Sequence, residues 1–338
     1  MLEPRGAASS TSFEPEPDVS ARVVIEARNA LLQGRISDAL ELVEGARHDL
    51  DLSEESRVEL ALTGVLSRLA RGDLRGAAPF SRELTALVRV RGSVAARACF
   101  GLGEFAAARG QTDLGVTYYE SAGDELDGAD ARTWLPWRSG LARILAARGE
   151  IATATGLVEE ELAEARVLDS PYAVASALRT MSAVAPTDRR VELLDEALAL
   201  LAGSDAARLE AQIRTDLAGW LLLLQPTASA QAVDLLRSAE KYARQEDLAP
   251  LLGRIRWLLE RLGEAPDGEL AGRMSELSAA EQRVAALVVV GKRNREIAVE
   301  LGISVKSVEW HVSHILRKLS ITSRLDLADA LAQPRQNR

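Results

Sequence analysis

The side chains near the C-terminus whose types and spacing suit binding chemistry lie on one face of a predicted helix. That helix opens at Ser304, a favoured N-cap residue, and runs to Leu319. Val308, Val312, Ile315 and Leu319 recur every three or four residues, which places them on its buried face. The opposite face carries cations, hydroxyls, a carboxylate and an indole. These groups are typical of a surface that binds a partner through charges and hydrogen bonds, and they do not form a catalytic arrangement. The exposed set is Lys306, Ser307, Glu309, Trp310, Ser313, His314 and Arg317.

The preceding segments supply the helices that must position this face. Ser278 is predicted to cap a first helix, with Glu281 three residues later in a capping box. A short second helix is expected over residues 294–301, and Gly302 makes the tight turn before the third. A last helix, at about residues 324–331, completes a predicted four-helix domain.

A repeat with a period of about 38 residues fills the first three quarters of the chain. Glycine recurs at Gly34, Gly72, Gly110 and Gly149, at spacings of 38, 38 and 39 residues, with helical apolar periodicity on both sides. Because glycine adopts the left-handed conformation that ends a helix, each unit is predicted to be a helix, a turn and a helix. A small residue five positions later lets the second helix pack closely: Ala39, Ala77, Gly115 and Ala154.

Two degenerate copies continue the series, with Pro186 and Pro226 in place of glycine as helix stops. About six hairpins are therefore expected between residues 21 and 262. The pattern resembles tetratricopeptide repeats, which implies a concave groove for a peptide, a protein or a small-molecule effector. Repeats that only pack and dimerise are the alternative. Trp134 and Trp137 are weak candidates for lining such a groove, since core packing explains most aromatic residues of this kind.

Composition favours an all-α fold, an α-solenoid of helical hairpins followed by a four-helix domain. Hydrophobic residues make up 47% of the 338 and aromatic residues only 4%. Alanine and leucine, which lose little side-chain freedom in a helix, abound. The net charge of −9 is unevenly spread, because residues 274–338 carry ten Lys and Arg against seven Asp and Glu, a net +3. A small basic module attached to an acidic body is the predicted organisation.

Proline and glycine mark the predicted domain boundaries. Residues 1–20 are expected to be a disordered tail, and residues 263–274 a linker. The repeat domain is assigned to residues 21–262 and the four-helix domain to residues 275–333. The sequence contains no apolar stretch approaching the ~18 residues that span a bilayer, and no signal-peptide core. We expect a cytoplasmic protein without a membrane partner.

Motifs for catalysis, metals and cofactors are not found in the sequence. Gly291 and Lys292 form the only Gly-Lys pair, and Arg293 follows where a phosphate loop needs serine or threonine. His48 has no second ligand at metal spacing, and Cys99 is the only cysteine, so no intrachain disulfide forms. We therefore predict no enzyme activity, no cofactor and no metal site.

The last predicted domain resembles the LuxR-type (GerE-like) helix-turn-helix family over residues 277–332. The run from Glu309 to His311 is of the kind found in large LuxR-family regulators related to MalT, which also carry tetratricopeptide-like repeats. Those regulators have an ATPase domain in front, which we do not expect in this chain. The residues on the family pattern are Leu277, Ser278, Glu281, Gly291, Asn294, Glu296, Ile297, Ala298, Leu301, Ile303, Ser304, Val308, His311, Ile315, Lys318, Leu319, Ser323 and Arg324.

The resemblance implies a sequence-specific transcriptional regulator that binds double-stranded DNA. Its second helix would cross the phosphate backbone, and its third would enter the major groove. The base-reading positions of the family fall on Glu309, Trp310 and Ser313. The phosphate-contact candidates are Arg293, Asn294, Arg295, Lys306, Ser307, His314, Arg317 and Lys318.

The resemblance also implies partners. Relatives dimerise through the last helix, so a homodimer is expected, and its candidate contacts are Leu325, Leu327, Ala328 and Leu331. RNA polymerase is a further expected partner. The alternative is a protein-interaction scaffold whose C-terminal helices contact RNA polymerase or another regulator. Binding to duplex DNA separates the two hypotheses.

Three side chains of the third helix allow more than one interpretation. Glu309 stands where many relatives have lysine, and it either accepts from a cytosine amino group or is a solvated bystander. Trp310 either contacts a thymine methyl group or a sugar, or packs against the first helix. For His311 a structural role, with hydrogen bonds inside the domain, is favoured over contact with DNA.

Overall fold

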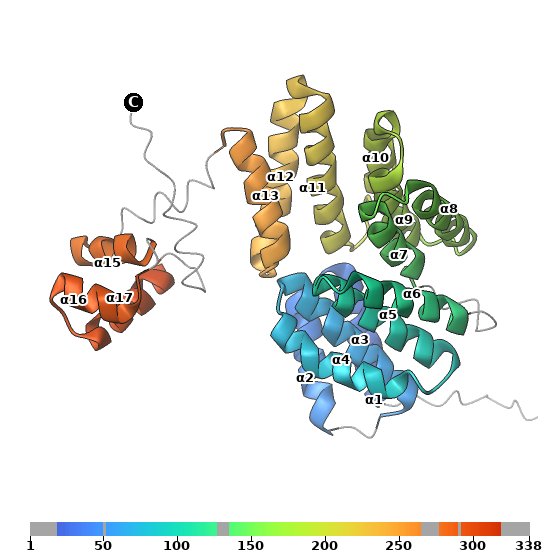
Figure 1. The fold of residues 1–338 in the computed structure, drawn as a ribbon, viewed down its shortest axis with the longest axis horizontal. Helices are drawn as coiled ribbons and strands as arrows, with labels where there is room; N and C mark the ends of the chain where they lie inside the picture. Colours follow the sequence, from blue (N-terminus) through green and yellow to red (C-terminus); the bar gives the residue numbers. More distant parts are fainter. Residues whose placement is uncertain (1–18, 50–51, 127–134, 265–276, 290–291, 319–338) are drawn as a thin grey trace, which may run out of the picture. The chain divides into compact units, whose positions relative to one another are not determined.

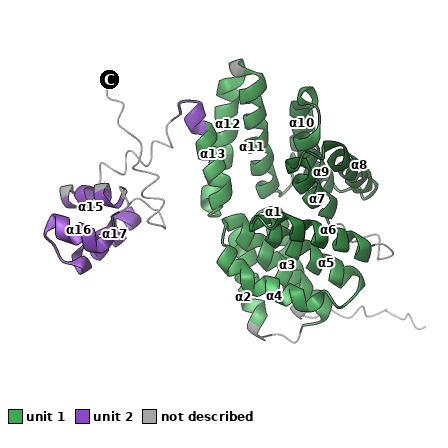
Figure 2. Cartoon of the chain, in the orientation of Figure 1, with its two compact units in different colours: residues 1–258 green, residues 259–338 purple. Residues whose placement is uncertain are grey.

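Every described element of the chain is a helix in the computed structural model, which confirms the predicted all-α class. The chain divides into two compact units, residues 1–258 and residues 259–338, coloured separately in Figure 2. Among the described helices, none combines the length and apolar character needed to cross a membrane. The described residues are 19–49, 52–126, 135–264, 277–289 and 292–318.

The first unit stacks helical hairpins in chain order, as Figure 1 shows, and this confirms the predicted solenoid. A single helix follows the sixth hairpin, which the sequence had not indicated as a separate element. That helix, α13 (Ala249–Arg261), runs across the boundary between the units. The hairpins are α1 (Val19–Gln33) with α2 (Ile36–Asp49), α3 (Glu54–Arg71) with α4 (Leu74–Leu87), α5 (Gly92–Ala108) with α6 (Thr112–Leu126), α7 (Trp137–Ala147) with α8 (Ile151–Val167), α9 (Pro171–Val184) with α10 (Arg190–Leu200), and α11 (Ala207–Leu224) with α12 (Ser229–Gln245).

Left-handed glycines close the first four hairpins, as predicted. The φ angles are +88° at Gly34, +78° at Gly72, +73° at Gly110 and +87° at Gly149, a conformation that costs glycine little. The small residues expected five positions later are all buried. In the last two hairpins the first helix stops before proline, and a short 3₁₀ helix follows. These are η1 (Thr187–Arg189) and η2 (Pro226–Ala228).

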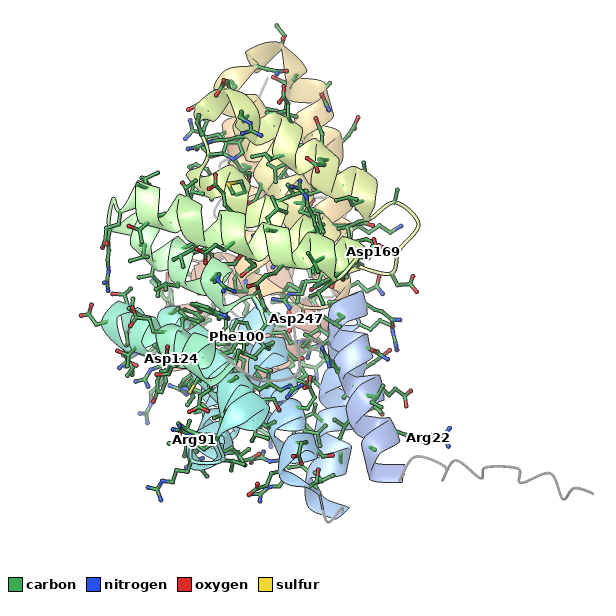
Figure 3. The ribbon with its side chains drawn as sticks, turned by 90° about the vertical axis from the view of Figure 1, so that its right-hand side faces the viewer. Arg22, Arg91, Phe100, Asp124, Asp169 and Asp247 are labelled. Carbon is green, nitrogen blue, oxygen red and sulfur yellow. The ribbon has the colours of Figure 1, made fainter. Side chains whose placement is uncertain are left out.

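Acidic side chains shape several of the remaining turns and helix starts. Asp247, labelled in Figure 3, adopts φ +58° between α12 and α13, which aspartate tolerates better than most residues. Glu125 Oε2 accepts from the N–H of Gly92 at 2.7 Å, and Glu161 Oε2 accepts from the N–H of Ser139 at 2.9 Å. The N-cap residues of α5 and α7 make no side-chain cap hydrogen bond. A carboxylate from the second helix of the hairpin therefore serves as the missing cap.

Ion pairs about one repeat apart join the first helices of neighbouring hairpins. Each pair joins an arginine and a carboxylate at equivalent positions of two consecutive hairpins, so charge pairing follows the register of the repeat. Such pairs add to the apolar packing between hairpins. An isolated hairpin could not bury its own apolar surface. The pairs are Glu59–Arg97 from α3 to α5 (3.0 Å), Glu104–Arg143 from α5 to α7 (2.7 Å) and Arg179–Asp216 from α9 to α11 (2.7 Å).

The first and last hairpins of this unit also contact each other. Tyr242 Oη of α12 donates to the carbonyl oxygen of Gly34 at 2.6 Å. Glu246 Oε2, just after α12, accepts from the N–H and the hydroxyl of Ser37 at 2.9 Å each, near the start of α2. Arg71, at the end of α3 in the second hairpin, donates to the Glu246 carbonyl oxygen at 3.1 Å and to Ser37 Oγ at 2.8 Å. The solenoid thus completes a turn, and we call these five residues the seam.

Three described helices of the second unit pack around one small core. They are α15 (Ala279–Val289), α16 (Asn294–Leu301) and α17 (Val305–Lys318), and α16 has the predicted bounds. Gly302 makes the expected turn, with φ +66°. The fourth helix, expected at residues 324–331, lies outside the described residues. The buried core consists of Leu277, Val284, Ala285, Val288, Ile297, Ala298, Val308 and Ile315.

Candidate nucleic-acid interface

Serine hydroxyls fix the starts of α15 and α17, as predicted. The N–H of Ser278 donates to Glu281 Oε2 at 2.7 Å, and the N–H of Glu281 donates to Ser278 Oγ at 3.3 Å, which completes the capping box. Ser304 Oγ accepts from the N–H of Ser307 at 3.0 Å, and the two hydroxyls share a hydrogen bond of 2.8 Å. The Ser307 hydroxyl is therefore already engaged inside the domain.

An ion pair ties the far end of α17 to the start of α15. Lys318 Nζ lies 2.7 Å from Glu281 Oε2, and the Glu281 side chain is only 5% exposed. Hydrogen bonds from Lys318 and from the Ser278 backbone lower the pKa of the Glu281 carboxyl to about 2. Sequence reasoning assigned Lys318 to phosphate and missed this pairing, because a partner 37 residues away leaves no local pattern.

The face of α17 opposite the core consists of exposed side chains. Val308 and Ile315 are completely buried on the core side. The three predicted base-contact residues share the exposed face with two of the predicted phosphate contacts. The Glu309 carboxylate makes no ion pair or hydrogen bond to any residue that the structure describes. The exposed residues of this face are Lys306, Glu309, Trp310, Ser313 and Arg317.

Trp310, His314 and Arg317 form a stack along this face. The Trp310 and His314 ring centroids lie 3.9 Å apart, with the ring planes inclined by 29°. Arg317 Nη2 lies 3.1 Å from Nδ1 and 3.3 Å from Nε2 of His314. Trp310 is nevertheless 55% exposed. Trp310 is therefore supported by its own helix and keeps a large accessible surface.

His311 is half-buried beneath the stack. Its ring meets the Trp310 ring nearly edge-on, with the centroids 5.1 Å apart and an interplanar angle of 77°. Its Nδ1 atom is buried and has no hydrogen-bond partner among the described residues. The expected hydrogen bonding of His311 inside the domain is therefore not seen at Nδ1, and ring packing is its described contact.

The start of α16 carries three further predicted phosphate contacts. The N–H of Arg293 donates to Glu296 Oε2 at 2.6 Å, which fixes the backbone where the helix begins. The side chains of Arg293 and Arg295 are exposed and make no ion pair with a described residue, while Asn294 is half-buried. Lys292, which sequence reasoning did not select, is paired with a carboxylate at the end of α16. Two free guanidinium groups thus lie at this helix end.

Of the two groove candidates of the repeat unit, Trp137 lies among the described residues, and it is half-buried. Trp137 packs over Gly123 of α6, where an added Cβ atom would come within 2.6 Å of the ring. An open pocket of about 570 Å³ lies between α8 and the α9–α10 turn, and Trp137 does not line it. Trp134 and the dimerisation candidates lie outside the described residues, the latter being Leu325, Leu327, Ala328 and Leu331.

Solved structures overlap most of the chain only loosely. A crystal structure of a Rap protein complexed with Competence and Sporulation Factor is 14% identical with a TM-score of 0.38, and covers 92% of this chain and 99% of that chain. The apo form of RapI is 11% identical with a TM-score of 0.33, and covers 93% and 97%. Neither likeness identifies a ligand of this chain.

Parts of the chain have similar sequences among characterised proteins. The transcriptional regulatory protein LiaR of Bacillus subtilis is 32% identical over 106 residues, which are 31% of this chain and 47% of LiaR. The transcriptional regulatory protein UhpA of Salmonella typhimurium is 40% identical over 58 residues, 17% and 30% of the two chains. The oxygen regulatory protein NreC of Staphylococcus carnosus is 42% identical over 53 residues, 16% and 24%. This chain spans less than half of each relative.

The sequence pattern and the arrangement of three helices concern the same segment. That segment, residues 275–331, matches the family described as bacterial regulatory proteins, luxR family. The predicted resemblance is confirmed there, with α16, the Gly302 turn and α17 as the helix-turn-helix. Residues 275–331 of this chain are a luxR-family helix-turn-helix domain.

Proposed function

We propose that this protein is a sequence-specific DNA-binding transcriptional regulator whose helix α17 enters the major groove. The observation that supports the proposal is the one-sided character of α17. Its apolar residues close the core with α15 and α16, while its other face exposes cations, a hydroxyl group and an indole. The major groove admits an α-helix, and such side chains bind phosphates and base edges there. The luxR-family match over the same residues supports the same function.

Four exposed cations are the proposed phosphate contacts. Arg293 and Arg295 lie at the start of α16, and Lys306 and Arg317 lie towards the two ends of α17. The first three make no ion pair with a described residue, so their charge is available to the DNA backbone. Lys318 is instead assigned a positioning role, because its ammonium group is bound to Glu281. Half-buried Asn294, Ser307 and His314 would contact phosphate only after rearranging their present contacts.

Removing one phosphate contact tests the proposal. Lys306→Ala should weaken binding to specific and random duplexes alike and lower the slope of log K against log salt by about one, because one counterion fewer is released. Fluorescence anisotropy of the full chain with a labelled duplex from its own promoter region, and with a random duplex, measures both quantities. Lys241→Ala is the matched control, since it removes the same exposed charge from α12.

Two outcomes would contradict this assignment. An equal effect of Lys306→Ala and Lys241→Ala would show that only the overall charge matters. If the wild-type chain bound RNA polymerase but no duplex in a salt-sensitive manner, the scaffold function would replace the regulator.

The finer parts of the proposal concern partners and location. We propose a cytoplasmic homodimer on a pseudo-palindromic site, with RNA polymerase as a further contact. The repeat unit would take up a peptide, protein or small-molecule effector, which is supported by the extended surfaces that stacked hairpins provide. Sedimentation velocity of the full chain, with and without its duplex, tests the dimer. A monomer in both conditions would contradict it.

A further inference from the structure

We infer that Trp310 is a specificity-determining residue that reads the C5-methyl group of a thymine, with His314 and Arg317 as the positioning residues that hold its indole. The inference rests on the proposed function and adds what α17 recognises in the groove. It is carried by the stack on α17, by the exposure of the indole and by the charges on either side of it.

The stack fixes the indole before DNA arrives. His314, one turn further along α17, lies against the Trp310 ring at 3.9 Å, and Arg317 contacts both nitrogens of that imidazole. His311 meets the indole edge-on. A side chain that is already held in one conformation loses less freedom when it binds, so more of its contact energy appears as affinity. Because Trp310 is still 55% exposed, the stack holds the ring without covering it.

The neighbours of Trp310 direct it towards bases and away from phosphates. Glu309 is exposed and carries a carboxylate without a partner among the described residues, which the phosphate backbone repels. Lys306 lies one turn before Trp310 and Arg317 two turns after it, on the same face. Cations that bind the backbone at either end would leave Trp310 and Glu309 facing the floor of the groove between them.

Thymine is the base that an apolar ring can distinguish from the others in the major groove. Of the base edges in the major groove, only that of thymine carries a methyl group. Burial of one methyl group against the indole corresponds to about a 4-fold gain in affinity. Glu309 beside it disfavours guanine, whose major-groove edge presents only acceptors.

Replacement of single thymines by uracil tests the inference, because it removes the methyl group and keeps base pairing. The full-length chain first selects a site from random duplexes, and each thymine of that site is then changed in turn. The wild-type chain should lose about 4-fold in affinity at one or two positions. Trp310→Ala should bind thymine and uracil equally at those positions. His314→Ala should reduce the uracil effect and leave the salt dependence unchanged.

The controls separate this inference from the function on which it rests. Trp310→Phe keeps an aromatic ring and should retain part of the uracil effect, with circular dichroism to confirm that each variant is folded. If uracil changed the affinity equally at every thymine of a duplex that the chain still prefers to random DNA, the inference about Trp310 would be overturned. The proposed DNA-binding function would stand. If the chain selected no duplex from the random pool, the proposed DNA-binding function itself would be contradicted. A further outcome is that His314→Ala weakens binding to the selected duplex and to a random duplex equally and lowers the salt dependence of both. That result would make His314 a phosphate contact and overturn its positioning role.

Discussion

Glu281 shows how much one carboxylate contributes to positioning the exposed face of α17. It caps α15 through Ser278 and binds Lys318 at the end of α17. The two contacts together fix the direction of α17, on which the exposed side chains depend. The luxR-type pattern placed Glu281 and Lys318 in the sequence separately, whereas their pairing follows from the packing of α17 on α15.

Ionisation of Glu281 should make the stability of the second unit depend on pH. Its folded pKa of about 2 lies below the ordinary value of 4.5, so its ionised form is favoured by folding. That contribution is complete above pH 4.5 and is lost as the pH falls towards 2. Glu281→Gln should lower the free energy of unfolding by about 1–2 kcal/mol at neutral pH and remove this acid dependence. Hydrogen exchange of the α15–α17 amides, measured at neutral pH and down through the acidic range, gives both effects.

Glu309→Gln is the control for the Glu281 variant, because it removes an exposed carboxylate without a described partner from the same unit. It should change the stability by less than about 0.5 kcal/mol. If the wild-type chain and Glu281→Gln showed the same acid dependence, the ion pair would not be the source of the effect.

At the scale of elements, the sequence predicted helix ends better than it predicted what the helices contact. The turns at Gly34 and Gly149 and the bounds of α16 follow from local signals, since glycine and proline act on their own backbone. The bond between Ser37 and Glu246 joins residues 209 positions apart, and no local pattern specifies it. Helical periodicity predicted the exposed face of α17 except at Ser307 and His314, which are half-buried. The stack of Trp310 on His314 was not, because it depends on side-chain conformation.

Two turn glycines with similar φ angles should differ in their tolerance of alanine. Gly149→Ala should cost about 1–2 kcal/mol from backbone strain alone, because no atom lies within 4 Å of the added Cβ. Gly34→Ala should cost more, since its Cβ would lie 2.6 Å from the Arg208 nitrogen and 2.7 Å from Tyr242 Oη. Urea denaturation of both full-length variants measures the difference. Equal losses would show that the packing around Gly34 contributes nothing.

At the scale of the whole molecule, the chain combines two units with separate cores and different charge. The sequence indicated this organisation through the change from a 38-residue repeat to a luxR-type pattern and through the sign of the charge. The contact between the first and last hairpins was not predictable, because it depends on how far each repeat rotates against the next. It is nevertheless the feature that distinguishes this solenoid from an open one.

Loss of the seam should make the two ends of the repeat unit open independently. Glu246→Ala removes the carboxylate that binds Ser37, so α1, α2 and α12 should exchange their amide hydrogens faster, while α5 to α8 stay protected. Hydrogen exchange of the full chain, resolved by helix, measures this. Glu159→Ala, which removes an exposed carboxylate from α8, should change neither region. Uniform acceleration along the whole unit would contradict the role given to the seam.

The joined ends change the cooperativity of unfolding. A linear array frays from its outermost repeats, because each of those has a neighbour on one side only. In a closed cycle every hairpin has two neighbours, so the first hairpin to melt must break two interfaces and the remainder then becomes an ordinary linear array. The repeat unit should therefore melt in a narrower transition than an open solenoid of six hairpins. An effector that held the ends together or apart would change the melting of all six hairpins at once.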